Sequence, residues 1–128
     1  MLLEQVAECE IYFINNWTAT PIQLVDKDFD YTGLDTWISL MYYPVLNERI
    51  GFDGTTQGRV MGTGIQAVFC YHKKQKLAIK LADDVKAFFS GKELPKDIHV
   101  DIGIDNNHTT LDNGFYEVRV NFLVTQYS

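Results

Sequence analysis

Apolar and polar residues alternate along two stretches in the second half of the chain, and a stretch with helical spacing separates them. The first stretch, 64–72, places these apolar side chains on one face of a strand: Ile65, Ala67, Phe69 and Tyr71. The last stretch, 115–127, alternates Tyr116, Val118, Val120, Phe122 and Val124 with Glu117, Arg119, Asn121 and Thr125. Between them, a helix over 75–89 would align Leu77, Leu81, Val85 and Phe88 along one stripe. This change of period predicts an α+β domain.

The first half of the chain predicts a helix followed by strands. Apolar side chains repeat near helical spacing over residues 2–16, which predicts an amphipathic N-terminal helix. A short strand is expected at 22–25. The stretch 36–45 is apolar on both faces and rich in aromatic residues, as in a central or interface strand. A further strand is expected over 59–72, with Gly62 and Gly64 suggesting a bulge or a bend.

Three remaining segments carry turn or loop chemistry. Residues 47–58 predict a mobile loop or a long hairpin tip. Residues 98–104 alternate weakly, and 105–114 is predicted to be a polar loop closed by Asn113 and Gly114, a pair typical of tight hairpins. The predicted fold is therefore a single α+β domain, 1–128. Its N-terminal helix and the helix of about 75–89 would pack on an antiparallel or mixed sheet.

Composition narrows the classes of function. The chain has 128 residues, 46% of them apolar and 13% aromatic, which is enough for a real core. Its 11 Lys and Arg against 17 Asp and Glu give a net charge of −6, which argues against general affinity for nucleic acid or anionic membranes. Glu4, Glu8 and Glu10 stand where a signal peptide would have a basic flank and an uninterrupted apolar stretch. No apolar run is long enough to cross a bilayer. We therefore expect a reducing cytoplasm, with Cys9 and Cys70 as free thiols.

The charge is unevenly distributed along the chain. Residues 73–97 carry seven lysines and four acids, against an acidic remainder. Two interpretations stay open: a solvated helix face, or a basic face that meets the acidic face of an identical subunit in a head-to-tail ring. The candidate contact residues are Lys73, Lys74, Lys76, Lys80, Asp26, Asp28, Asp30, Trp37, Tyr43, Arg59, Glu117 and Arg119. The aromatic members would be interface anchors, and Glu117 and Arg119 an exposed or intersubunit pair.

Partial motifs for catalysis, metal binding and cofactor binding occur in the sequence, but each lacks a residue or a neighbouring element that the site requires. The series Asp26, Asp28 and Asp30 opens like a calcium loop, but Tyr31 and Trp37 stand where glycine and a bidentate glutamate are needed. Glycines 62 and 64 fit a relaxed dinucleotide fingerprint, yet a strand pattern follows where a helix should begin. Cys70 and His72 share a strand face without a local orienting acid. We expect no enzyme activity, no cofactor and no metal.

The order of elements resembles the tail terminator proteins of long-tailed phages and prophages. The stretches that carry the resemblance are 22–25, 37–41, 64–69, 81–89 and 114–122. The resemblance implies a structural protein of the virion tail or neck, made in the host cytoplasm. Such proteins form hexameric rings that cap the tail tube, stop polymerisation of the tube protein and present a surface for the head. The implied partners are further copies of the chain, the tail tube protein and a head–tail connector or stopper protein, without membrane or sequence-specific nucleic acid. The resemblance supplies no catalytic residue.

Two other functions remain open at this point. One is another assembly role in the same particle, such as a head-completion, connector or minor tail protein. The other is a small-ligand-binding or enzymatic α+β domain that uses the acidic turn at 26–30 or the glycine segment at 58–64. Asp28→Ala and Gly64→Val variants that abolish a ligand-induced thermal shift, with assembly unchanged, would favour the ligand-binding domain.

Overall fold

The computed structural model describes residues 2–24, 27–45, 60–110 and 113–127, with the backbone alone for 2, 60, 61 and 106–108. Its elements follow in the order α1 (Leu2–Asn16), β1 (Ile22–Leu24), β2 (Thr36–Val45), β3 (Val60–His72), α2 (Gln75–Phe89), β4 (Glu93–Leu94), β5 (Ile98–Val100), β6 (Ile104–Thr110) and β7 (Tyr116–Tyr127). The predicted bounds of α1, β2 and α2 are confirmed. The predicted loop at 47–58 lies outside the described residues.

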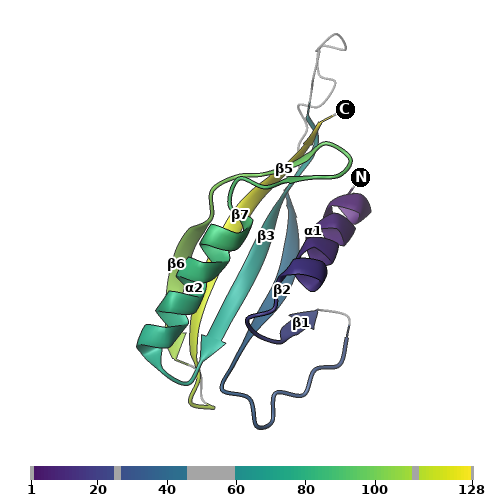
Figure 1. The fold of residues 1–128 in the computed structure, drawn as a ribbon. Helices are drawn as coiled ribbons and strands as arrows, with labels where there is room; N and C mark the ends of the chain where they lie inside the picture. The colour runs from purple at the N-terminus through teal and green to yellow at the C-terminus, as the bar shows by residue number, and fades with distance from the viewer. Residues whose placement is uncertain (1, 25–26, 46–59, 111–112, 128) are drawn as a thin grey trace.

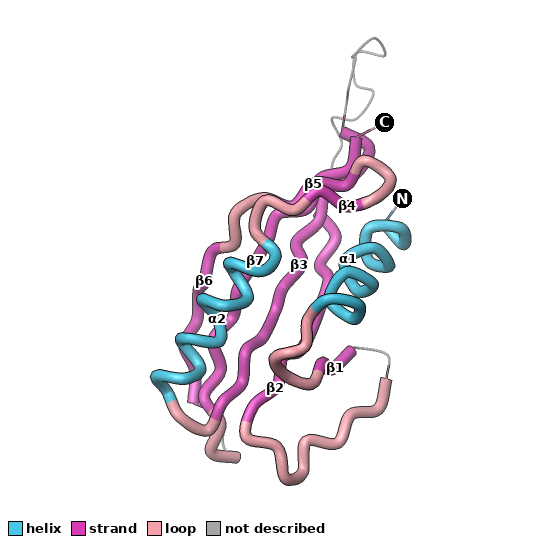
Figure 2. Tube along the Cα trace, viewed as in Figure 1, coloured by secondary structure: helices cyan, strands magenta, loops and turns pink. Residues whose placement is uncertain are grey.

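The described strands form one mixed sheet. Its order is β1-β2-β3-β7-β5-β4, and β6 pairs with the same strand, β7, as β5 does. The pair β1–β2 is parallel, whereas the other pairs are antiparallel. Helices α1 and α2 lie side by side over one face of this sheet (Figure 1; Figure 2). The α+β fold that the sequence predicts is therefore correct.

The core fills the layer between the helices and the sheet. Phe13 of α1 lies 4.7 Å from Phe89 of α2 between ring centroids, and Phe89 in turn lies 5.0 Å from Phe122 of β7. Beneath these rings the sheet contributes Ile38 and Val68, both fully buried. Aromatic rings at this spacing add to the stability that their buried apolar area supplies. The core is thus closed by aromatic contacts between helices that are far apart in sequence: Phe13 and Phe89 are separated by 76 positions (89 − 13).

The buried stripe of α2 is rotated from the one that the sequence predicts. On α2 the buried residues are Ala78, Leu81, Ala82, Val85 and Phe89. Leu77 is 40% exposed, so its assignment to the core stripe is wrong. On α1 the helix buries Gln5, Cys9 and Phe13, while Leu3 is exposed. Small alanines let α2 approach the sheet closely, which favours the observed rotation over one that buries Leu77.

The apolar alternation of β3 faces away from the helices. Val68 and Cys70 belong to the core beneath the helices. Because successive side chains of a strand point to opposite faces, Ile65, Phe69 and Tyr71 lie on the other side of the sheet. The sheet is therefore apolar on both faces, and the prediction that β2 is apolar on both sides is confirmed.

The polar loop predicted at 105–114 is wrong, because most of it is strand β6. Its backbone pairs with β7 from Ile104 opposite Asn121 to Thr110 opposite Tyr116. An edge strand tolerates polar side chains since one of its edges faces solvent, so hydrophobic patterning gives no signal there. The hairpin signal is correct: Gly114 has φ +87°, and the Asn113 side chain accepts a hydrogen bond from the Phe115 amide at 3.2 Å. The weak strand expected at 98–104 is limited to β5, Ile98–Val100.

Candidate interaction surface

The face of the sheet opposite α1 and α2 is the most distinctive surface in the described chain, and we call it the second face. It is built from rows of residues that face one another across β2, β3 and β7. Its members are Trp37, Ser39, Met41, Tyr43, Ile65, Ala67, Phe69, Tyr71, Glu117, Arg119, Asn121 and Leu123. Cross-strand pairs of aromatic and branched residues at this spacing stabilise a sheet. The second face is accordingly a continuous, largely apolar surface with few charges.

One end of the second face is closed by an aromatic cluster around Trp37. The Trp37 ring stacks on Tyr31 at 4.9 Å and on Tyr71 at 4.7 Å, and Phe115 meets it edge-on at 4.7 Å. Its indole nitrogen donates to Gln23 at 3.2 Å. Only 3% of Trp37 is exposed, so this side chain supports the second face from within. Tyr31 is the member of the cluster that remains exposed to solvent.

Arg119 lies in the middle of the second face. Its guanidinium lies 5.1 Å from the centroid of the Tyr43 ring and 5.3 Å from that of Phe69, and its Nε donates to Asn121 at 3.0 Å. Both rings hold the guanidinium in place through cation–π attraction. Two residues that the sequence singled out, Tyr43 and Arg119, are therefore brought together. Arginine and tyrosine in an apolar setting are typical of the energetic centres of protein interfaces.

Glu117 lies on the same face but is directed to a different partner. Burial raises the pKa of the Tyr71 hydroxyl, and the hydrogen bond between Tyr71 and Glu117 raises it further. Tyr71 is thus protonated at neutral pH and donates to the carboxylate. The sequence led us to expect a pair between Glu117 and Arg119. In the structure Glu117 contacts Tyr71, and Arg119 contacts the rings of Tyr43 and Phe69.

The predicted lysine contacts lie at the start of α2. Lys73 forms an ion pair with Asp35 at 3.3 Å, and Lys80 pairs with Asp84 one turn along the helix at 3.1 Å. Lys74 and Lys76 are exposed at the first turn. Exposed ion pairs of this kind contribute little to stability, about 0–1 kcal/mol, and exchange partners readily. The expectation that these lysines meet a second subunit stays a prediction.

The acidic turn has a local structural role. The Asp30 carboxylate accepts a hydrogen bond from the Thr32 amide at 2.9 Å. Hydrogen bonding from the Thr32 side chain and, to a lesser extent, from this amide holds the pKa of Asp30 below its usual value. Asp28 is exposed, while Asp26 and Arg59 lie outside the described residues. Within the described ranges, no three His, Cys, Asp or Glu side chains are placed to share a metal ion.

The glycine segment makes room for side chains. A Cβ on Gly64 would overlap the ring of Tyr42. Without that Cβ, the Tyr42 hydroxyl reaches Gln5 of α1 and donates to its Oε1 at 2.6 Å. A Cβ on Gly62 would likewise lie 2.8 Å from the amide nitrogen of Gln5. These glycines therefore serve the packing of α1 on the sheet.

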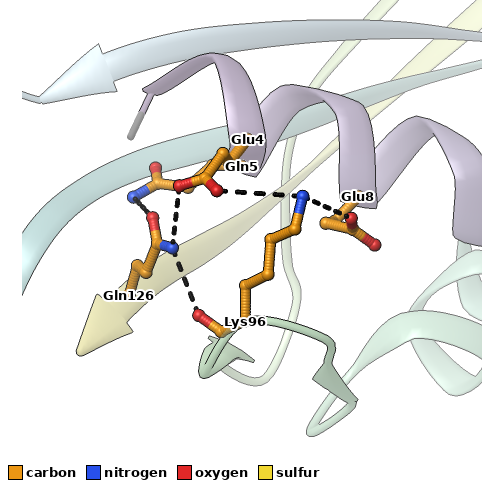
Figure 3. Close-up of polar contacts among 5 residues, drawn as sticks. All are labelled: Glu4, Gln5, Glu8, Lys96 and Gln126. Atoms are coloured by element: carbon orange, nitrogen blue, oxygen red, sulfur yellow. Dashed lines mark hydrogen bonds and ion pairs between the residues drawn. The ribbon is translucent and has the colours of Figure 1, made fainter. Parts of the chain in front are cut away.

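A buried polar cluster joins α1 to the end of β7, and sequence reasoning missed it (Figure 3). Gln5 donates to Gln126 at 3.3 Å, and Gln126 donates to the Lys96 carbonyl at 3.2 Å and to Glu4 at 3.4 Å. The Lys96 ammonium lies 3.4 Å from Glu8 and 3.7 Å from Glu4. Lys96 itself has φ +66°, a strained conformation that these contacts hold in place. The one available signal was Gln126, which continues the buried phase of Phe122 and Val124.

The cysteines are buried and poorly reactive. Burial raises the pKa of the Cys9 thiol to about 12 and also raises that of Cys70. His72, two positions after Cys70, accepts a hydrogen bond at Nδ1 from the Lys74 amide at 3.0 Å. Its imidazole therefore satisfies a backbone amide just before α2 begins. Both thiols would be uncharged at neutral pH. A thiol in that state does not act as a nucleophile.

Comparisons with known proteins define the fold alone. No family model matches the chain, and no curated protein matches it. Among the solved structures that match, one whose name says nothing of its function has a TM-score of 0.63 at 13% identity. The match covers 95% of this chain and 89% of that one. The described helices include none that is long and apolar enough to cross a membrane.

Proposed function

We propose that this protein is a structural subunit of a long-tailed phage particle, which closes the end of the tail tube as a ring of identical copies. In that position it stops polymerisation of the tube protein and presents a surface to the head. The proposal rests on the resemblance in element order to tail terminator proteins. The second face is the observation that carries it.

The composition of the second face supports a role in assembly. A soluble monomer rarely leaves a large contiguous apolar surface in contact with water. Here Met41, Tyr43, Ile65 and Phe69 are only partly buried, and Leu123 is exposed beside them. Arg119 occupies the centre of this surface. An aromatic and apolar centre with one arginine matches the composition of subunit interfaces.

A ring requires that each copy present two different surfaces, because head-to-tail contacts close only when unlike patches meet. The second face supplies one such patch. In the proposed role, the ring would then dock its flat side on the last ring of the tube. Identical subunits with an acidic net charge and a basic segment can use charge to select the correct neighbour.

Assembly in solution and on tubes tests the proposal. Purified protein at working concentration should scatter light as an oligomer and form rings in negative stain. Added to polymerising tail tube protein, it should shorten the tubes and remain at their ends. A strict monomer that neither binds tube ends nor limits tube length would refute the proposed function.

Deleting the gene from its phage distinguishes two roles within the particle. Overlong tails are expected if the protein ends tube growth. Tails of normal length that fail to join heads would instead indicate a connector or head-completion protein. Complementation with the wild-type gene is the control, because it should restore both length and joining.

A further inference from the structure

We infer that the acidic turn of one copy binds to the start of α2 in a neighbouring copy of the same chain. This inference rests on the proposed ring and specifies one contact within it. The surface that receives the turn, which we call the lysine surface, consists of Lys73, Lys74, Leu77 and Lys80. The acidic turn contributes Asp28 and Asp30, and the exposed Tyr31 follows them directly.

The lysine surface has an exposed leucine at its centre. Leu77 is 40% exposed, and the three lysines lie three or four positions from it in sequence, which places them around it at the start of α2. Beside Leu77 the surface is hollowed by a groove of about 190 Å³, which Thr20, Thr36 and Leu81 also line. An apolar centre with a charged rim is the composition of a contact surface between proteins.

The start of α2 lacks the negative groups that stabilise a helix start. Its first turn has no acidic residue, and Lys74 at the N-cap position makes no side-chain capping hydrogen bond. The amides of a first helical turn and the positive end of the helix dipole favour a carboxylate. Within the described residues, the Lys74 ammonium also has no ion-pair partner. A carboxylate from a neighbouring copy would therefore meet both the helix start and an unpaired lysine.

The acidic turn presents its carboxylates on a fixed support. Tyr31 stacks on Trp37 at 4.9 Å, and the Asp30 carboxylate accepts a backbone amide at 2.9 Å. A turn that is fixed before binding loses less entropy on association. Asp28 is exposed, and no lysine or arginine of the described chain, including the adjacent Lys27, lies within ion-pair distance of it. Aspartates beside an exposed tyrosine thus complement lysines around an exposed leucine.

The two surfaces are placed for a head-to-tail contact. They lie at the same end of the molecule but toward different edges of the sheet (Figure 1). The acidic turn joins β1 to β2 at one edge, whereas α2 packs on β3 and β7. A rotation about an axis along the strands therefore brings the turn of one copy to the lysine surface of the next, and such contacts close a ring. Because the turn borders the second face at Trp37, this contact extends the patch that the second face supplies.

A charge-reversal experiment tests this contact. Lys74→Glu and Asp28→Lys should each raise the concentration needed for half-assembly by about tenfold, since each places like charges together. An equal mixture of the two variants should assemble nearly as the wild type does, because alternating copies pair opposite charges at every contact. The matched controls are Lys92→Glu and Glu93→Lys, beyond the other end of α2, which change the net charge equally and should leave assembly unchanged. Circular dichroism melting of each variant verifies that it folds.

Salt separates a charge contact from a loss of packing. At about 1 M salt the Debye length is about 3 Å, so the repulsion in either variant should be largely screened. Both variants should then assemble at concentrations within about twofold of the wild-type value. Variants that remain about tenfold weaker at this salt concentration would overturn the inference.

Cross-linking identifies the surfaces directly. Asp28→Cys protein and Leu77→Cys protein, mixed and oxidised, should give disulfide-linked dimers that neither variant gives alone. The native thiols do not interfere because Cys9 and Cys70 are buried. Chains that carry both substitutions should be linked into species larger than a dimer, as a head-to-tail contact requires. Linkage that stops at the dimer, or dimers from one variant by itself, would overturn the inference.

The failure of this inference is distinguishable from the failure of the proposed function. Wild-type rings, with both charge variants assembling as the wild type does, overturn the inference and leave the proposed function intact. A wild-type protein that stays monomeric refutes the proposed function itself.

Discussion

The two faces of the sheet have similar side chains but bury them to different depths. On the helix-covered face, Val68 and Phe122 are fully buried beneath α1 and α2. On the second face, Phe69 and Tyr43 are only partly buried and share the guanidinium of Arg119. Burial under the helices stabilises the monomer, whereas the partly buried apolar area on the second face can still yield free energy on association. Four substitutions, ordered by expected effect, test this difference.

The largest effect is expected for Phe89→Ala on the helix-covered face. Phe89 is fully buried and contacts rings of both α1 and β7. Removing a fully buried phenylalanine side chain costs about 3–5 kcal/mol of unfolding free energy, because it loses apolar burial and leaves a cavity. Urea denaturation followed by circular dichroism measures this loss. A loss below about 1 kcal/mol would show that the two faces contribute alike to the monomer.

Gln5→Ala should have the next largest effect. It would leave the Tyr42 hydroxyl without its acceptor and Gln126 Oε1 without its donor in a buried setting. An unsatisfied buried polar group costs about 1–3 kcal/mol. The matched control is Asn15→Ala on the exposed side of α1, which should leave the unfolding free energy unchanged or slightly higher. Equal stabilities of the two variants would contradict a structural role for the polar cluster.

Phe69→Ala separates stability from assembly. The monomer should lose only about 1–2 kcal/mol, because Phe69 is partly exposed and its removal leaves no closed cavity. The loss of assembly, measured by light scattering, should be larger than the loss of monomer stability, measured by the melting temperature, would account for. Val68→Ala, the neighbouring position on the covered face, should show the reverse order. The comparison fails if both variants change stability and assembly in the same proportion.

The smallest effect concerns pH. Burial lowers the pKa of His72 below its usual value, and the nearby Lys74 adds to this, while Asp35 acts in the opposite direction. The folded protein therefore binds this proton more weakly than the unfolded chain does. Stability from His72 is present above its unfolded pKa of about 6.5 and is lost as pH falls through the lower folded value.

His72→Asn isolates this contribution, since an asparagine oxygen can replace Nδ1 as the acceptor for the Lys74 amide. Between pH 7 and 5 the wild type should lose slightly more stability than the variant. Thermal melts across this range provide the measurement. Parallel profiles of stability against pH for both proteins would show that His72 does not contribute to the pH dependence of stability.

Much of the fold follows from local patterns in the sequence. The bounds of α1, β2 and α2 follow from apolar spacing, and the Asn113–Gly114 turn follows from its two residues. Strand β6 has no such signal, because only its pairing with β7 defines it. For the candidate surface, the sequence indicated Tyr43 and Arg119 as separate residues, and the register of β2, β3 and β7 brings them together. The polar cluster was out of reach because Gln5 and Gln126 are 121 positions apart.

The sequence by itself determined most of the helices and strands, with β4 and β6 as exceptions, and that β2 would be apolar on both sides. Periodicity carries that information because it depends on neighbours a few residues apart. Only the tertiary structure decided which side of the sheet the helices cover, and therefore which apolar side the helices leave uncovered. That choice depends on the packing of Ala78, Ala82 and Phe89 against Val68 and Phe122. Such contacts join distant parts of the chain, and no local pattern contains them.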